Sequence, residues 1–99
     1  MSRSTSDWYY CEQILSASVH ASTTTVVLAP EEYGRKRVMV YNHSPARLFL
    51  KLGPGASSQD FTLAMAADSY FECPHPAVEQ AVTGFWTSAT GSAMVTRLF

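Results

Sequence analysis

The sequence is short of charge. Only 15% of its 99 residues are Asp, Glu, Lys or Arg, against about 25% in an average soluble domain. Seven basic and eight acidic side chains leave a formal net charge of −1. This balance argues against a general binder of nucleic acid or of membrane surfaces. A low fraction of charged residues has two possible explanations: part of the surface is covered by partner proteins, or the chain is simply a small β domain.

Long apolar runs and targeting signals are also missing from the sequence. No stretch approaches the ~20 apolar residues that a membrane-spanning helix needs. Residues 1–10 are rich in Ser and Thr and lack the apolar centre of a secretion signal. We therefore expect a protein that is made in the cytosol and stays there, or that leaves by a route other than secretion.

Cysteines and metal-binding spacings are sparse. The two cysteines, Cys11 and Cys73, lie far apart in the chain, and a cytosolic origin favours two reduced thiols over a disulfide, although the disulfide stays open geometrically. None of the cysteines or of the three histidines (His20, His43 and His75) stands at a C-x₂-C or H-x₃-H spacing. The sequence predicts no metal site and no cofactor.

Catalytic motifs are absent as well. The sequence has no G-x-S-x-G nucleophile elbow. Glu31, Glu32 and Asp68 fall in expected loops, where carboxylates are usually solvated. Gly53-Pro54-Gly55 is too short for a phosphate-binding loop and is explained by a backbone turn. We expect a protein without enzymatic activity.

The stretch from Arg37 to Met65 contains the clearest secondary-structure signal. Residues 37–42 have the β-branched and aromatic content of a strand. Residues 47–52 alternate with period two, with Leu48, Leu50 and Leu52 on one face and Arg47 and Lys51 on the other. Residues 42–46 have turn chemistry. The pattern predicts a hairpin over 37–52, extended by a third strand over 61–65 into an antiparallel meander.

Further strands are expected before and after this meander. Residues 13–20 alternate as a candidate first strand, with a short helix as the alternative, and the other segments with strand character are 23–28, 70–73, 80–87 and 92–99. Strands at this spacing, separated by turn signals, are typical of an all-β sandwich or barrel. We predict an antiparallel β-sandwich of seven or eight strands over residues 23–99, preceded by an extended N-terminal arm and candidate first strand over residues 1–22.

Two aromatic features have different expected roles. Trp86 lies within the strand over 80–87 and is predicted to be core. Trp8, Tyr9 and Tyr10 come too early in the chain for ordinary core, and aromatic side chains are favoured anchors at protein interfaces. This triplet is the first candidate interaction site, with packing against the chain's own sandwich as the alternative.

A second candidate interaction site is basic. Arg35, Lys36, Arg37, Arg47 and Lys51 account for five of the seven basic residues and could form one patch if the strands over 37–42 and 47–52 pair. Such a patch could contact an acidic protein surface. The alternative is a charged rim that protects a sheet edge from pairing with other chains. No aromatic stacking platform accompanies it, which argues against single-stranded nucleic acid.

Several short strings follow one another in a set order along the chain. They are Arg37, Val40-Tyr41-Asn42-His43-Ser44, Leu48-Phe49, Leu52-Gly53, Ala56-Ser57, Phe61-Thr62-Leu63, Tyr70-Phe71-Glu72, Pro74, Val82-Thr83-Gly84-Phe85-Trp86, Ser88-Ala89 and Gly91-Ser92-Ala93-Met94-Val95-Thr96. Through them, the chain from about Thr23 to Leu98 resembles a family of small structural proteins encoded by tailed bacteriophages.

The chain departs from this family at two points. Ala66-Ala67-Asp68 stands where the family often has a Pro-Gly-Gly type of turn, and Arg97 stands where an acidic residue is common. The second difference changes surface charge and therefore bears on the identity of the partner. Residues 1–22 lie outside the resemblance.

The resemblance implies a β-sandwich component of the virion, assembled in the host cytoplasm. The expected role is a capsid decoration or cement protein bound to the head exterior. The expected partners are the major capsid protein or other virion proteins and further copies of the chain, with a trimer favoured and with no nucleic acid or membrane.

Two other roles are open. The first is a neck, tail or fibre-attachment component of the virion. The second is a carbohydrate-binding module, in which Trp8, Tyr9, Tyr70 or Trp86 would stack on a sugar. A buried Trp86 would count against the sugar binder, and a cluster of exposed aromatics in a groove would favour it.

Overall fold

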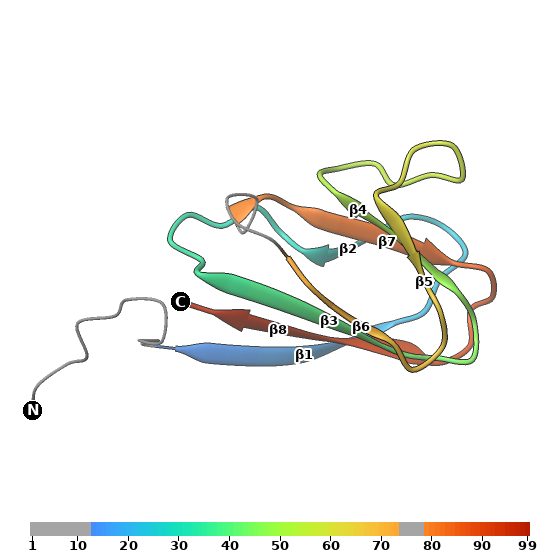
Figure 1. Ribbon diagram of the computed structural model, residues 1–99, viewed down its shortest axis with the longest axis horizontal. Coiled ribbons are helices and arrows are strands. Elements are labelled where there is room, and N and C mark those ends of the chain that lie inside the picture. The colour runs from blue at the N-terminus through green and yellow to red at the C-terminus, as the bar shows by residue number, and fades with distance from the viewer. Residues whose placement is uncertain (1–12, 74–78) are drawn as a thin grey trace, which may run out of the picture.

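A computed structural model of the chain describes residues 13–73 and 79–99, which form two stacked four-stranded sheets (Figure 1). The eight strands are β1 (Ile14–His20), β2 (Val26–Ala29), β3 (Arg37–His43), β4 (Leu48–Leu52), β5 (Leu63–Met65), β6 (Tyr70–Glu72), β7 (Val82–Trp86) and β8 (Ser92–Leu98). The described ranges contain no α-helix. The predicted fold class, an antiparallel sandwich of seven or eight strands, is confirmed.

The strand order defines the architecture. One sheet, here sheet A, has the order β1-β8-β3-β6, and the other, sheet B, has the order β2-β7-β4-β5. All six strand pairs are antiparallel. The first strand pairs with the eighth, the second with the seventh, the third with the sixth and the fourth with the fifth. The chain is thus doubled back between β4 and β5 and wound as a two-stranded ribbon, which is the topology of a jelly roll.

This winding corrects one predicted pairing. The expected hairpin between β3 and β4 is wrong, because β3 lies in sheet A and β4 in sheet B. The turn between them instead carries the chain from one sheet to the other. The expected meander of β4 and β5 is confirmed, with Leu48 opposite Met65. In both sheets, every second residue of a strand faces the core. An alternating sequence therefore does not distinguish a hairpin within one sheet from a crossing to the other sheet.

The core lies between the sheets. Its largest fully buried apolar side chains are Trp86, Leu48, Leu50, Val38, Val40, Val82 and Val95. Trp86 is 1% exposed, which confirms its predicted core position. Its indole Nε1 donates a hydrogen bond of 3.0 Å to Oδ1 of Asn42. Since Trp86 belongs to sheet B and Asn42 to sheet A, this bond joins the two layers.

Asn42 also fixes the crossing between the sheets. Its side-chain amide donates to the carbonyl oxygens of Ala46 at 2.9 Å and Ala66 at 3.0 Å. A buried amide stays in place only when its polar atoms are paired, and here the pairing holds two connections against β3. The turn that was expected to close a hairpin is therefore held by a residue of the core.

The N-terminal segment contributes a full strand to sheet A. β1 pairs one-to-one with β8, from Ile14 opposite Leu98 to His20 opposite Ser92. The choice of strand over short helix for this segment is confirmed. The sandwich therefore includes residues on both sides of position 23.

Candidate interaction surfaces

The outer face of sheet A carries Ile14, Tyr41, Tyr70 and Met94, four of the seven exposed large hydrophobic side chains among the described residues. The strand register places Tyr70, Tyr41, Met94 and Ser18 in one row across the sheet. Their neighbours Val40 and Val95 point into the core, so alternation turns this row outward. Tyr70 is 72% exposed, Met94 38% and Tyr41 37%. Three large side chains thus stand side by side on the outer face of sheet A.

We call this surface the sheet A face. It comprises the outward side chains of its four strands: Ile14, Ser16, Ser18, His20, Arg37, Met39, Tyr41, His43, Tyr70, Glu72, Ser92, Met94, Thr96 and Leu98. The small polar residues of β1 and β8 lie on one side of Tyr41 and Tyr70. Tyr and Met are enriched at protein interfaces.

The charges on the sheet A face largely cancel. Arg37 and Glu72 form an ion pair, with side chains 39% and 38% exposed. The hydroxyl of Tyr41 donates to Oδ1 of Asp68 at 3.2 Å, and its ring stacks on His43 with centroids 5.8 Å apart. Desolvation, together with the hydrogen bond to Asp68 and the charge of that residue, raises the pKa of Tyr41. This phenol is therefore neutral at physiological pH, and the face can dock an apolar partner without burying an unpaired charge.

The five basic residues do not form one patch. Arg35 is buried, with its guanidinium donating to the carbonyl oxygen of Pro30 at 2.7 Å and to Oε1 of Glu32 at 2.9 Å. Arg37 pairs with Glu72 on sheet A, and Lys51 on sheet B pairs with Asp60 at 2.5 Å.

The two remaining basic residues, Lys36 and Arg47, are exposed. Lys36 precedes β3 of sheet A and Arg47 precedes β4 of sheet B. The expected basic patch fails for the same reason as the expected hairpin: β3 and β4 belong to different layers.

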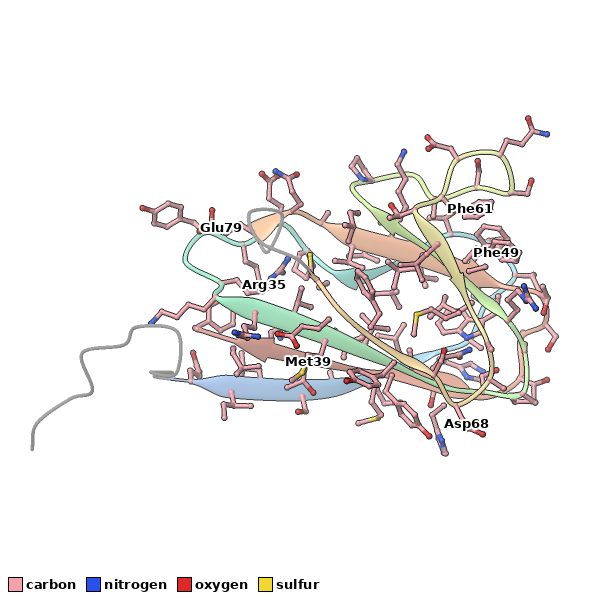
Figure 2. All side chains as sticks on the ribbon, viewed as in Figure 1. Arg35, Met39, Phe49, Phe61, Asp68 and Glu79 are labelled. Carbon is pink, nitrogen blue, oxygen red and sulfur yellow. The ribbon has the colours of Figure 1, made fainter. Side chains whose placement is uncertain are left out.

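A second cluster of aromatic side chains lies on sheet B. The ring of Phe49 stacks on that of Phe85 with centroids 5.1 Å apart, and meets Phe61 edge-on at 4.9 Å. In Figure 2, Phe49 and Phe61 lie together at one end of the sandwich, far from Arg35. The loop before Phe61 folds back here, since the hydroxyl of Thr83 donates to the carbonyl of Gly53 at 2.7 Å. These rings mainly pack on one another and secure the loop.

Polar groups at the end of the sandwich line a shallow depression. It is bordered by His43, Ser44, Pro45, Asp68 and Gly91. The hydroxyl of Ser44 donates to the carbonyl of Thr90 at 2.6 Å and accepts from the amide of Ala46 at 3.0 Å. The hydroxyl of Ser44 thus uses both its donor and its acceptor to hold the turns together, so Ser44 is a structural residue.

The titratable groups form no reactive cluster within residues 13–73 and 79–99. Groups of three or more His, Cys, Asp or Glu side chains able to hold a metal ion do not occur there. Cys73 is buried, and burial raises the pKa of its thiol in spite of the opposing charge of Arg35. Such a thiol is mainly protonated and weakly nucleophilic. The same ranges contain no helix that is long and apolar enough to cross a membrane.

The predicted arm anchors Trp8, Tyr9 and Tyr10 lie outside the described residues. The sequence, in contrast, did not lead us to expect an interface on the sheet A face. Tyr70 was considered only as a residue that could stack on a sugar. A signal was present, because β3 and β8 have large apolar side chains on both alternation faces, as Met39, Tyr41 and Met94 show. Strands that are apolar on both faces are typical of sheets covered on both sides.

Compared with protein-family models, curated proteins and solved structures, the chain shows no match.

Proposed function

We propose that this protein is a structural component of a bacteriophage virion, and more specifically a decoration or cement protein that binds and stabilises the head exterior. The observation that supports it most is the sheet A face, a nearly neutral surface with Tyr41, Tyr70 and Met94 exposed. A soluble protein that leaves such side chains together on one face has a use for them in binding.

The fold suits a passive structural role. Eight strands in two layers with a continuous core give a rigid scaffold, on which an interface changes little upon binding. Jelly rolls recur in viral capsid and lectin domains. This is an analogy of fold alone, since one fold hosts many functions, but it agrees with the resemblance of residues 23–98 to phage structural proteins.

In this proposal the partners are the major capsid protein, other virion proteins and further copies of the chain. The sheet A face supplies aromatic anchors, and the arm residues Trp8, Tyr9 and Tyr10 reach across neighbouring subunits. Neither contact needs a cofactor, a nucleic acid, a membrane or a catalytic group. A neck, tail or fibre-attachment position uses the same contacts and is the alternative location.

The carbohydrate-binding alternative loses one of its stacking residues. Trp86 is buried and hydrogen-bonded to Asn42, so it cannot meet a sugar. Tyr70 is exposed on β6 and is not among the residues that border the depression described above. The interface role therefore explains the exposed aromatics better.

Binding to heads that lack the protein tests the role of the sheet A face. Purified heads are mixed with full-length protein and separated by sedimentation. Tyr70→Ser and Met94→Ser should each weaken binding about tenfold, as expected for anchor residues at an interface. Tyr33→Ser is the control, because Tyr33 is 95% exposed in the β2–β3 connection, outside this face. Equal binding by all four proteins would exclude the sheet A face as the docking surface.

A further inference from the structure

β1 is an open sheet edge within the described part of the chain. The amides and carbonyls of Gln13 and Phe99 bond to each other at 2.9 and 3.4 Å, and the amide of Ala21 donates to the carbonyl of Gly91 at 2.9 Å. In an antiparallel pair, the backbone groups of every second residue bond to the neighbouring strand. The bonds at positions 13 and 21 show that the odd-numbered residues of β1 are the ones that bond to β8. The backbone N–H and C=O groups of Ile14, Ser16, Ser18 and His20 therefore point to the free edge.

This edge lacks the features that normally prevent pairing with another chain. The strand reads Ile-Leu-Ser-Ala-Ser-Val-His, without Lys, Glu or Pro, and its register with β8 has no bulge. Most soluble proteins protect a long edge with charge, proline or a bulge. A seven-residue edge with none of these can accept another strand.

The core-facing side of β1 is also not fully covered by sheet B. Ala17 is on the core-facing side of sheet A, opposite Val95, yet Ala17 is exposed whereas Val95 is 1% exposed. Leu15 and Val19, on the same side, are only partly buried. Figure 1 shows β1 at the lower margin of the molecule, with β8 and β3 between it and the strands of sheet B. Its inner side chains thus lack a complete apolar cover from the described residues.

We propose that β1 pairs antiparallel with β1 of a second copy of this chain, about a two-fold axis that passes beside Ala17. In this register Ile14 lies opposite the partner's His20, and Ser16 opposite the partner's Ser18. All four residues with outward backbone groups then form hydrogen-bonded pairs. Shifting the register by two residues in either direction leaves some of these groups without a partner.

The side chains agree with the same register. On the inner side, Leu15 meets the partner's Val19, and Ala17 meets the partner's Ala17, so the partly open apolar side chains cover one another. On the outer side, small hydroxyls meet hydroxyls, and no like charges face each other. The strand is therefore complementary to itself, which favours a second copy over an unrelated peptide.

This pairing joins the two A sheets into one eight-stranded sheet and places both sheet A faces on a continuous surface. Pairing a strand with itself generates two-fold symmetry. A dimer thus replaces the trimer favoured from the sequence as the proposed unit of assembly. The inference does not depend on the virion role, because it concerns the protein in solution.

A cysteine placed on the axis tests both the contact and its register. In the Cys11→Ser background, Ala17→Cys would put two thiols on a non-hydrogen-bonded pair, where Cα atoms lie about 4.5 Å apart and a disulfide can form. Ser16→Cys is the matched control, since its partner copy would lie diagonally, about 7–8 Å away. Mild oxidation of the full-length variants should convert most of Ala17→Cys to a covalent dimer and little of Ser16→Cys.

Sedimentation of the full-length protein provides a second readout. The wild type should approach twice 10.9 kDa as its concentration rises. Ala17→Lys, which puts like charges across the axis at an already exposed position, should remain monomeric and should melt at the temperature that the wild type shows when dilute enough to be monomeric. Equal crosslinking at positions 16 and 17, absence of crosslinking at 17, or a wild type that is monomeric or trimeric at every concentration would overturn the proposal.

Discussion

Arg35 shows how the surroundings of a residue decide its role. Its guanidinium is buried and donates to Glu32 and to the carbonyl oxygens of Pro30 and Gln80, and Glu32 also accepts from Arg97 at 2.6 Å. These bonds tie the β2–β3 connection to the start of β7 and to β8. Arg35 is thus a structural residue, although its neighbours Lys36 and Arg37 in the sequence suggested a surface patch.

Replacing Arg35 should be destabilising. Arg35→Ala leaves the carbonyl oxygens of Pro30 and Gln80 without this donor, whereas Glu32 keeps Arg97 as its ion-pair partner. Removing the hydrogen bonds of a buried charged donor costs about 1–3 kcal/mol. Urea unfolding of the isolated protein measures the difference. Arg47→Ala is the control, because Arg47 is exposed, and it should change the free energy of unfolding by less than about 0.5 kcal/mol. Equal effects of the two substitutions would contradict the buried role.

Trp86 is the largest side chain of the core and should be its most sensitive one. Trp86→Ala removes a buried ring and leaves Asn42 without its indole donor. We expect a loss of about 3–5 kcal/mol, a large share of the ~5–15 kcal/mol that stabilises a typical domain. Thermal melting checks this, with the exposed Tyr33→Ala as the control. An unchanged melting temperature would show that Trp86 is not core.

At the scale of the elements, the sequence predicted where the strands are better than how they pair. Residues 37–42, 70–73 and 92–99 were expected as strands and match β3, β6 and β8 to within one residue at each end. Alternation and turn residues are local signals, so they locate strands well. The choice between a hairpin and a crossing to the other sheet depends on Asn42, whose partners Ala66 and Trp86 are distant in the sequence.

The candidate surfaces could be predicted only in part. The basic patch assumed that β3 and β4 are neighbours, and that assumption failed. The sheet A face depends on the pairing of β3 with both β8 and β6, which brings Tyr41, Met94 and Tyr70 together from three segments. No local pattern encodes that arrangement, although the apolar residues on both faces of β3 and β8 were a hint.

The turn before β8 should be intolerant of side chains. Gly91 has φ of +93°, and a Cβ there would lie 2.8 Å from Cα and Cβ of Ser44. Gly55 has φ of +77° but open space around it. Both Gly→Ala changes should cost about 1–2 kcal/mol for the left-handed backbone. Gly91→Ala should cost about 1–3 kcal/mol more because of the overlap.

Chemical unfolding of the two variants measures this difference directly. The comparison removes the shared backbone strain and isolates the contact between the β7–β8 turn and the turn after β3. Equal destabilisation by Gly91→Ala and Gly55→Ala would mean that the two turns do not press against each other.

At the scale of the whole molecule, the proposed function assigns separate tasks to two regions. The sandwich provides stability and the sheet A face, whereas residues 1–10 provide anchors for neighbouring subunits. Ordering a backbone residue costs about 1–2 kcal/mol, and in this segment Trp8, Tyr9 and Tyr10 offer most of the apolar area that could offset the cost. Contacts with other subunits would supply the rest.

Deletion of residues 1–10 should therefore separate folding from assembly. The truncated protein should keep its melting temperature, because β1 and the core are intact, but its incorporation into particles should fall sharply. Melting and particle binding are compared for the truncated and full-length proteins. Equal particle binding would reject the assembly role of the arm, and a collapse of the melting temperature would assign it to the core instead.

Locating the protein on purified particles tests whether it is part of a virion. Particles assembled by the phage or prophage that carries this sequence are purified on a density gradient, analysed for peptides of the chain, and labelled with an antibody for electron microscopy. We predict that the peptides sediment with the particles and that the label covers the head exterior. Label confined to the neck or tail would favour the alternative location, and purified particles without any peptide of this chain would contradict the account.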